Sequence, residues 1–152
     1  MKIEGTRFGS VEIADEDVLE FPKGILGFSD LRRFVLLPHR NSTSVAWLQS
    51  LDSPGIALPV VSAHALEAGY EGAMTRLELN ALGVSDPNEI AALLVLSVTP
   101  GLPPTVNGKA PILVDAVTRK GVQVVLQGTP FSTRDPLVLS PEELSLAEAT
   151  AA

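Results

Sequence analysis

Apolar residues occur in short runs along most of the chain, and Gly, Pro, Asn, Asp or Ser interrupts each run. Stretches with a long 3.6-residue apolar period are scarce, so the pattern favours β-strands over helices. The predicted strands are Lys2 to Thr6, Gly9 to Ile13, Val18 to Phe21, Phe34 to Pro38, Ser44 to Gln49, Ile56 to Val61, Thr75 to Leu79, Ala92 to Thr99, Ile112 to Val117 and Val122 to Leu126. Because these strands share one core, closure into a barrel would remove the exposed edges that invite aggregation. We therefore predict a mainly β, small antiparallel barrel-like single domain over residues 1–140, with one or two short helices.

The segment Ile112 to Leu126 has the pattern of a β-hairpin. Thr118 to Lys120 form its polar centre, and Gly121 can adopt the left-handed conformation that closes a three-to-five-residue loop with a bulge. Alternate residues from Val122 to Leu126 lie on one face of the return strand, which we expect to be core. Gln123 lies on the other face, which is partly polar.

Helix signals occur in two places. Ser85 to Glu89 combines a capping residue, a first-turn proline and an acid, which is typical of a helix start. Because the apolar run Ile90 to Val98 follows directly, we expect a single helical turn that leads into a buried strand. Ser140 to Leu144 repeats the start signal before an Ala-rich end, so residues 141–152 should form a short helical or frayed tail.

The loop from Glu20 to Phe28 contains two phenylalanines, a proline and two glycines. We expect Phe21 and Phe28 to anchor its ends in the core, while Gly24 and Gly27 allow positive φ angles. This composition specifies a backbone path and supplies no catalytic side chain. It therefore indicates recognition, or a well-anchored surface loop without a partner.

The composition limits the classes of function. The 152 residues fit one domain, and 45% hydrophobic with 19% charged residues excludes a disordered chain. The net charge of −7 argues against direct binding to nucleic acid or anionic membranes, because phosphate contacts need clustered Lys and Arg. A basic protein partner suits this charge better. With no cysteine, no apolar leader and no long apolar stretch, we expect a soluble, cytoplasmic protein.

Residues that could perform catalysis or bind a metal are scattered. His39 and His64 lie in different segments without the spacing of helical metal ligands. No Gly-x-Ser-x-Gly elbow, P-loop or Gly-x-Gly-x-x-Gly motif occurs. Acids within Glu12 to Asp17, or at Glu142 and Glu143, are explained more simply by polar turns and helix starts than by glycoside hydrolysis. We therefore expect no enzyme activity, no cofactor and no metal.

Four collinear blocks, which span roughly residues 3 to 137, carry a resemblance to a known family. They are Glu20-Phe21-Pro22-Lys23-Gly24-Ile25-Leu26-Gly27-Phe28; Trp47-Leu48-Gln49-Ser50 followed by Pro54; Thr105-Val106-Asn107-Gly108-Lys109-Ala110-Pro111-Ile112; and Gly121-Val122-Gln123-Val124-Val125-Leu126 with Phe131-Ser132-Thr133-Arg134. In the order and spacing of these blocks the chain resembles the flagellar assembly factor FliW family.

Four positions depart from the pattern of that family. Gly108 takes the last position of the usual Thr-Val-Asn-Leu, Asp115 replaces a common Asn, Phe131 a frequent Tyr, and Asp135 a His that often follows the arginine. Gly108 removes apolar contact area, and Asp135 places a negative charge where the family has a group that titrates near neutrality. If this edge contacts a partner, we expect the preference of this chain to differ.

The resemblance implies a non-enzymatic, cytoplasmic regulator with a small β-barrel-like fold. FliW-like proteins bind and antagonise the RNA-binding translational regulator CsrA, and they also bind flagellin. Free flagellin occupies the FliW-like protein and leaves CsrA to repress flagellin translation. Export of flagellin releases the FliW-like protein, which then captures CsrA. We expect this chain to bind both proteins and to be a monomer when free.

A partner-binding surface is expected at aromatic and polar residues of the family blocks, namely Phe28, Trp47, Asn107, Gln123 and Arg134. Each of them has a structural alternative. Asn107 can cap a turn, Gln123 can face solvent on an ordinary strand, and Arg134 can pair with Asp135 or with the acids near the C-terminus. Both aromatic side chains can belong to the core.

Two other classes of function remain open at this point. A small β-barrel ligand-binding protein or enzyme would need an internal pocket of several hundred Å³ with convergent polar groups. Barrels of this size usually fill their interior with side chains, and no set of acid, base and nucleophile is visible. A purely structural homo-oligomer is the third possibility, and a large stable assembly in sedimentation would favour it.

Overall fold

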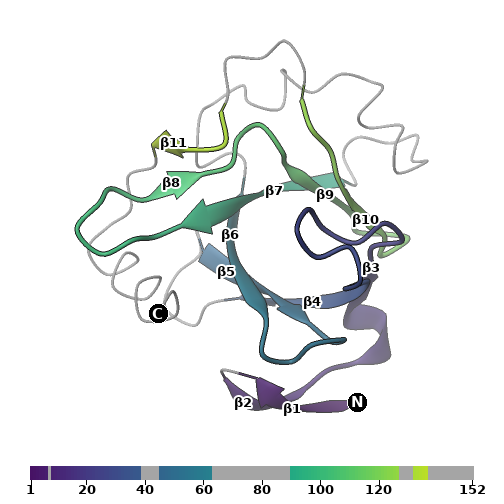
Figure 1. The fold of residues 1–152 in the computed structure, drawn as a ribbon. Coiled ribbons are helices and arrows are strands. Elements are labelled where there is room, and N and C mark those ends of the chain that lie inside the picture. The colour runs from purple at the N-terminus through teal and green to yellow at the C-terminus, as the bar shows by residue number, and fades with distance from the viewer. Residues whose placement is uncertain (7, 39–44, 63–89, 127–131, 137–152) are drawn as a thin grey trace.

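The computed structural model describes residues 1–6, 8–38, 45–62, 90–126 and 132–136, and nearly all of its regular structure is β (Figure 1). The strands are β1 Lys2–Thr6, β2 Gly9–Glu12, β3 Val18–Glu20, β4 Arg33–Pro38, β5 Val45–Ser50, β6 Ala57–Ser62, β7 Ile90–Ser97, β8 Thr105–Val106, β9 Ile112–Asp115, β10 Gly121–Gln123 and β11 Asp135–Pro136. The helical element within these residues is a single 3-10 turn, η1, at Asp15–Asp17. The prediction of a mainly β single domain is thus confirmed.

The strands form one large antiparallel sheet with the order β10-β9-β7-β6-β5-β4-β3. β8 pairs with β7 and with β11, while β1 and β2 form a separate hairpin. The sheet curves until its two ends approach each other (Figure 1). There, one bridge joins Glu20 to Lys120, and the Glu20 amide donates to the Arg119 carbonyl at 2.9 Å.

The predicted closed barrel is not confirmed, because this single bridge is not a continuous ladder between β3 and β10. The sequence gives a physical reason. β3 ends at Glu20, and Pro22 has no backbone N–H with which a longer β3 could pair. The sheet therefore stays open between its end strands.

Most predicted strands within the described residues occur with bounds shifted by a few positions. β7 begins at Ile90, before the predicted start at Ala92, and ends at Ser97. The predicted strand Thr75 to Leu79 and the helix starts at Ser85 and Ser140 lie outside the described residues. Sequence reasoning missed β8 and β11, because two-residue strands are too short to produce an alternating pattern.

The core is centred on side chains from both ends of the sheet. Phe21 and Phe34 are fully buried and meet edge to face, with ring centroids 5.3 Å apart at 76°. The same cluster also contains Leu19, Ile25, Leu48, Val60, Leu93, Ile112 and Val114. Aromatic pairs in this geometry add to the stabilisation that burial provides. Phe21 thereby links the start of the 21–28 loop to the centre of the sheet.

The β9–β10 hairpin is confirmed, with Gly121 opposite Val114 and Gln123 opposite Ile112. The role predicted for Gly121 is wrong, since Arg119 is the residue with positive φ, at 60°. Position 121 needs a glycine because the ring of Phe21 leaves no room for a side chain there. A Cβ there would lie 2.9 Å from Cε1 of Phe21 and closer still to Cε2 and Cζ.

The 21–28 loop follows the predicted path with one change of anchor. Gly24 and Gly27 have φ angles of 67° and 86°, as their type suggested. Ile25 is 3% exposed and is the second core anchor, whereas Phe28 is only half-buried. The Phe28 amide donates to the Ile25 carbonyl at 2.7 Å and closes the turn between them.

Within the described residues, no helix is long and apolar enough to cross a bilayer.

Candidate protein-binding surfaces

Gln123 joins three of the four family blocks through its side-chain amide. Its Oε1 accepts the Leu26 amide of the 21–28 loop at 2.9 Å, and its Nε2 donates to the Ala110 carbonyl at 2.9 Å. Gln123 itself lies on β10. The amide is suited to this position because it offers one acceptor and donors on a single planar group. Gln123 is therefore more than a solvent-facing residue of an ordinary strand.

Asn107 holds the turn that leads from β8 to β9. Its side-chain Oδ1 accepts the Ala110 amide at 3.0 Å, and its own amide donates to the Val95 carbonyl at 3.0 Å. The side chain is half-buried, and Gly108 beside it is buried. Asn107 thus has the turn-forming role that the sequence left open. Ala110 links the Asn107 turn directly to Gln123.

Arg134 directly precedes β11, on a turn that contacts the segment after Asn107. The Lys109 amide donates to the Ser132 carbonyl at 3.0 Å. Asp135 accepts the Ser132 amide at 2.9 Å and the Ser132 hydroxyl at 3.1 Å, so its carboxylate serves this turn. The Arg134 side chain is exposed and forms no ion pair with Asp135.

Trp47 lies in the core at 3% exposure. It pairs with Leu37 on β4 and Pro59 on β6, and its ring centroid is 5.7 Å from that of Phe8. A partner could reach this side chain only after local rearrangement. Phe28, by contrast, is only half-buried.

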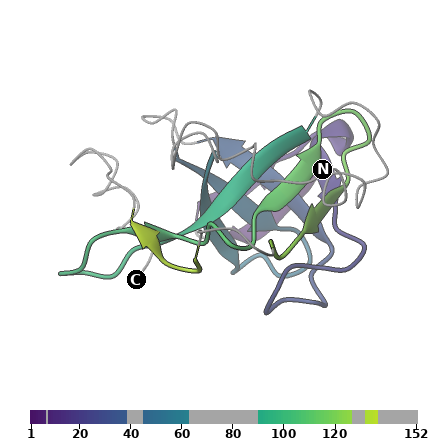
Figure 2. The same cartoon turned by 90° about the horizontal axis from the view of Figure 1, so that it is seen from above.

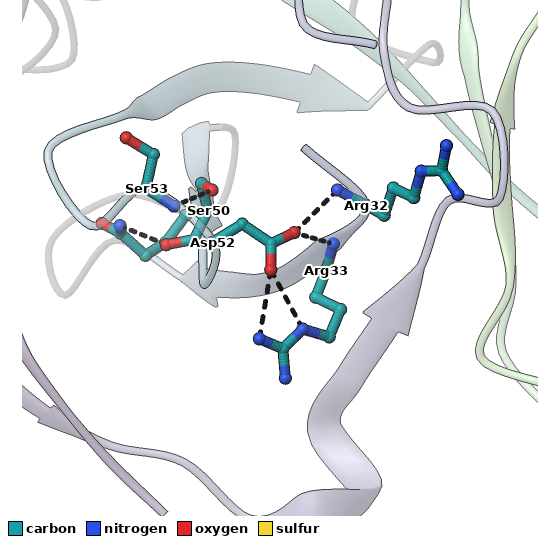
Figure 3. Close-up of polar contacts among 6 residues, drawn as sticks. Arg32, Arg33, Ser50, Asp52 and Ser53 are labelled. Atoms are coloured by element: carbon teal, nitrogen blue, oxygen red, sulfur yellow. Dashed lines mark hydrogen bonds and ion pairs between the residues drawn. The ribbon is translucent and has the colours of Figure 1, made fainter. Parts of the chain in front are cut away.

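Asp52 forms a clamp that sequence reasoning missed (Figure 3). Its Oδ2 accepts the amides of Arg32 and Arg33 at 2.8 and 2.9 Å, and its Oδ1 contacts Nε and Nη2 of Arg33, both at 3.1 Å. Burial acts to raise the pKa of Asp52, but these hydrogen bonds and the Arg33 charge outweigh it and lower the pKa. The run Asp52-Ser53-Pro54-Gly55 is a recognisable turn signal, but its partner 20 residues away is not visible in the sequence.

Gln49 supports the same loop from inside. It is fully buried, and its Nε2 donates to the carbonyls of Ser50 and Pro54 at 2.8 Å each. The Ser53 amide donates to Oγ of Ser50 at 2.9 Å (Figure 3). Gln49 and Ser50, the polar residues of the Trp47 to Ser50 block, therefore hold this loop in its conformation.

Asp115, one of the departures from the family pattern, is also architectural. It is 1% exposed, and its Oδ1 accepts the amides of Val117 at 2.8 Å and Thr118 at 3.3 Å. The Val117 bond lowers the pKa of Asp115, burial opposes it, and the Thr118 bonds add to the lowering. An Asn could accept the same bonds, so Asp115 preserves the turn. Phe131, another departure, lies outside the described residues.

Exposed acids gather around η1. Its three residues Asp15, Glu16 and Asp17 are all exposed, and Glu12 before it and Glu20 after it are exposed as well. The Asp17 carbonyl accepts Nη2 of Arg119 at 3.2 Å, which ties η1 to the β9–β10 turn. We call Glu12 to Glu20 the acidic edge.

Within the described residues, no three His, Cys, Asp or Glu side chains are grouped closely enough to hold a metal ion. His39 and His64 lie outside them.

The fold and these surfaces define a mainly β, single-domain protein in which loops and turns from distant blocks are joined by side-chain amides. The family described as FliW protein matches residues 2–137. The flagellar assembly factor FliW of Bdellovibrio bacteriovorus is 39% identical over 139 residues, which cover 90% of this chain and 79% of that protein. The FliW of Thermotoga neapolitana is 32% identical over 148 residues, covering 96% and 97% of the two chains. The crystal structure of a flagellar assembly factor FliW superimposes with a TM-score of 0.80 at 28% identity, covering 93% of this chain and 99% of that one.

The chain therefore belongs to the FliW family of flagellar assembly factors. This confirms the resemblance inferred from the four sequence blocks.

Proposed function

We propose that this chain is a non-enzymatic, cytoplasmic regulator that binds CsrA and antagonises it, and that also binds flagellin. When flagellin occupies the chain, CsrA is free to repress flagellin translation. When flagellin is exported, the released chain captures CsrA. The chain would in this way couple flagellin export to flagellin synthesis.

The observation that carries this proposal is the position of Gln123. Its amide contacts Leu26 in one family block and Ala110 in another, while Gln123 belongs to a third. The residues by which the chain resembles its family thus meet in space, although Leu26 and Gln123 are 97 positions apart in sequence. Loops from three family blocks that are held together in this way support a role in protein recognition.

The acidic edge suits CsrA as a partner. An RNA-binding protein presents basic surface to phosphates, so exposed acids attract it and repel the competing RNA. The exposed carboxylates at Asp15 to Asp17 lie on one short turn, where their fields add. Attraction between exposed charges is screened over about 10 Å at 0.1 M salt. CsrA binding should therefore weaken as the ionic strength rises.

A pull-down of the purified chain with CsrA and with flagellin from the same cell tests the function itself. Binding to neither protein would refute it. Arg134→Ala should weaken binding of at least one partner, whereas Arg32→Ala removes a similarly exposed arginine elsewhere and serves as the matched control. Asn107→Ala should also weaken binding, because the Asn107 turn loses its bond to the Ala110 amide. Unchanged binding in both variants would refute only the proposed surface.

The electrostatic step has its own test. Asp15→Asn, Glu16→Gln and Asp17→Asn together should slow association with CsrA and reduce its dependence on salt. Glu4→Gln with Asp30→Asn removes exposed acids outside the acidic edge and should change the association rate less. If CsrA binding is insensitive to salt and to both sets of substitutions, the electrostatic step is wrong while the function can stand.

A further inference from the structure

Asn107 and Gly108 form a sequence pair with a chemistry of its own. Of the asparagines in the chain, Asn107 is the one that a glycine follows, whereas Asn41, Asn80 and Asn88 precede serine, alanine and glutamate. Glycine has no Cβ, so its backbone nitrogen can approach the preceding side chain without steric hindrance. The pair therefore places a nitrogen nucleophile next to the amide carbon of an asparagine.

The reaction open to this pair is deamidation, in which solvent water is the only other reactant. The Gly108 nitrogen attacks Cγ of Asn107 and forms a C–N bond, the bond from Cγ to Nδ2 breaks, and ammonia leaves with the amide proton of Gly108. Water then opens one of the two carbonyls of the cyclic imide. Opening at Cγ gives aspartate, and opening at the main-chain carbonyl gives isoaspartate.

The fold holds Asn107 in an arch beside β7. β8 and β9 pair with β7 one after the other (Figures 1 and 2). Residues 107–111 connect them and lie opposite only Leu94 and Val95 of β7, so the extra residues cannot continue as a paired strand. Asn107 begins this arch and is half-buried, and Gly108 is buried.

Two hydrogen bonds fix Asn107 at the start of the arch. Its amide donates to the Val95 carbonyl, and its Oδ1 accepts the Ala110 amide, both at 3.0 Å. An asparagine that accepts an amide three residues later holds its side chain across the turn. Closure of the imide needs rotation of this side chain and of the main chain before Gly108. That rotation moves Oδ1 away from the Ala110 amide.

We propose that Asn107 is a site of spontaneous deamidation, and that the native fold protects it until the Asn107 turn opens locally. A local opening costs less free energy than global unfolding, because it breaks few contacts. The contacts at stake are the bonds of Asn107 to Val95 and Ala110. Gln123 stabilises the same turn, since its Nε2 donates to the Ala110 carbonyl at 2.9 Å. The rate of deamidation is therefore set by how often this turn opens.

The two products differ in their effect on the fold. Aspartate adds a negative charge but keeps an oxygen that can accept the Ala110 amide. Isoaspartate adds one carbon to the main chain, so the bonds to Val95 and Ala110 cannot both be kept. Gln123 binds both Ala110 and Leu26. Isoaspartate at position 107 should therefore also speed hydrogen exchange at the Leu26 amide.

The experiment follows deamidation of the whole chain in mildly alkaline buffer, folded and in urea, by peptide mass spectrometry that separates aspartate from isoaspartate. In urea, Asn107 should convert before Asn41, Asn80 and Asn88, because they lack a following glycine. In the folded chain, Asn107 should convert more slowly by roughly tenfold or more, which needs only a modest free energy of local opening.

Two variants separate local opening from global unfolding. Gln123→Leu removes the bond to the Ala110 carbonyl and should speed deamidation of the folded chain severalfold. Asp52→Asn disturbs polar contacts of a different turn and is the matched control, so it should leave the rate unchanged. In urea, Gly108→Ala should slow the reaction, because its methyl group hinders the attack.

Three results would overturn the inference. Equal rates in the folded chain and in urea would show that the fold gives no protection. Equal rates in Gln123→Leu and the unaltered chain, or an equal acceleration by Asp52→Asn, would show that opening of the Asn107 turn does not control the reaction. Conversion of Asn107 no faster than that of the other asparagines in urea would remove the site itself.

Discussion

Substitution of Gly121 by alanine tests whether the space next to Phe21 controls the stability of the fold. The added Cβ would lie 2.9 Å from Cε1 of Phe21 and closer to two other ring atoms, which is shorter than real Cβ contacts allow. The ring cannot turn away freely, because Phe21 is fully buried and in contact with Phe34. Either the ring or β10 must shift.

The size of the effect follows from two opposing contributions. Overpacking a filled core costs about 1–3 kcal/mol. Replacing glycine by alanine lowers the entropy of the unfolded chain, which stabilises by about 0.4–1 kcal/mol where the backbone is compatible. Gly121 has no positive φ, so this gain applies. We expect a net destabilisation of about 1–2 kcal/mol, which lowers the melting temperature by about 2–8 °C for a chain of this size.

Urea unfolding of four proteins measures this contribution: the unaltered chain, Gly121→Ala, Phe21→Leu and the double variant. A smaller side chain at position 21 makes room for the new Cβ, so the cost of Gly121→Ala should shrink in the Phe21→Leu background. Gly55→Ala is the control, because a Cβ at Gly55 meets no atom within 4 Å and its φ is not positive. Gly121→Ala at full stability, or strictly additive costs, would show that the reasoning about Phe21 is wrong.

Two further predictions concern the polar contacts. Asp52→Asn should lower the free energy of unfolding by about 1 kcal/mol at neutral pH, a value reduced for the solvent exposure of Arg33. Since the pKa of Asp52 is lowered in the folded state, its contribution is present above the usual aspartate pKa and is lost as the pH falls through the folded value. The gap between Asp52→Asn and the unaltered chain should thus begin to narrow below about pH 4, and an equal gap at pH 7 and pH 3 would contradict the clamp. Gln123→Leu should cost about 1 kcal/mol and speed hydrogen exchange at the Leu26 amide, which loses its acceptor. Gln123→Glu keeps that acceptor and loses the donor to Ala110, so unequal protection of Leu26 in the two variants is the expected result, and equal protection would contradict it.

Local sequence pattern determined much of this fold. Short apolar runs predicted most of the described strands, because the pattern of a strand depends only on residues that follow one another in the sequence. The positive φ angles of Gly24 and Gly27 were predictable for the same reason, since glycine type and turn conformation are properties of one short segment. The four collinear blocks were also sufficient to identify the family.

The candidate surfaces were only partly predictable. Asn107, Gln123 and Arg134 were chosen as polar residues within family blocks, and their neighbours were unknown. The structure joins Asn107 to Gln123 through Ala110, leaves Arg134 exposed and places Trp47 in the core. The turn at Pro100-Gly101 was overlooked, although its residues are a recognisable signal, because the pairing of β7 with the two-residue strand β8 is a property of the folded sheet.

Tertiary structure alone decided the contacts between distant segments. Gly121 has its role because Phe21, a hundred positions earlier, is brought against it, and the left-handed residue of the hairpin turned out to be Arg119. The approach of β3 to β10 likewise depends on the curvature of the whole sheet, although the proline that limits their pairing is visible in the sequence. Periodicity and turn chemistry act between neighbours along the chain, so the sequence reveals them directly. Steric fit and hydrogen bonds across the sheet depend on which strands the topology makes adjacent, and only the folded chain establishes that.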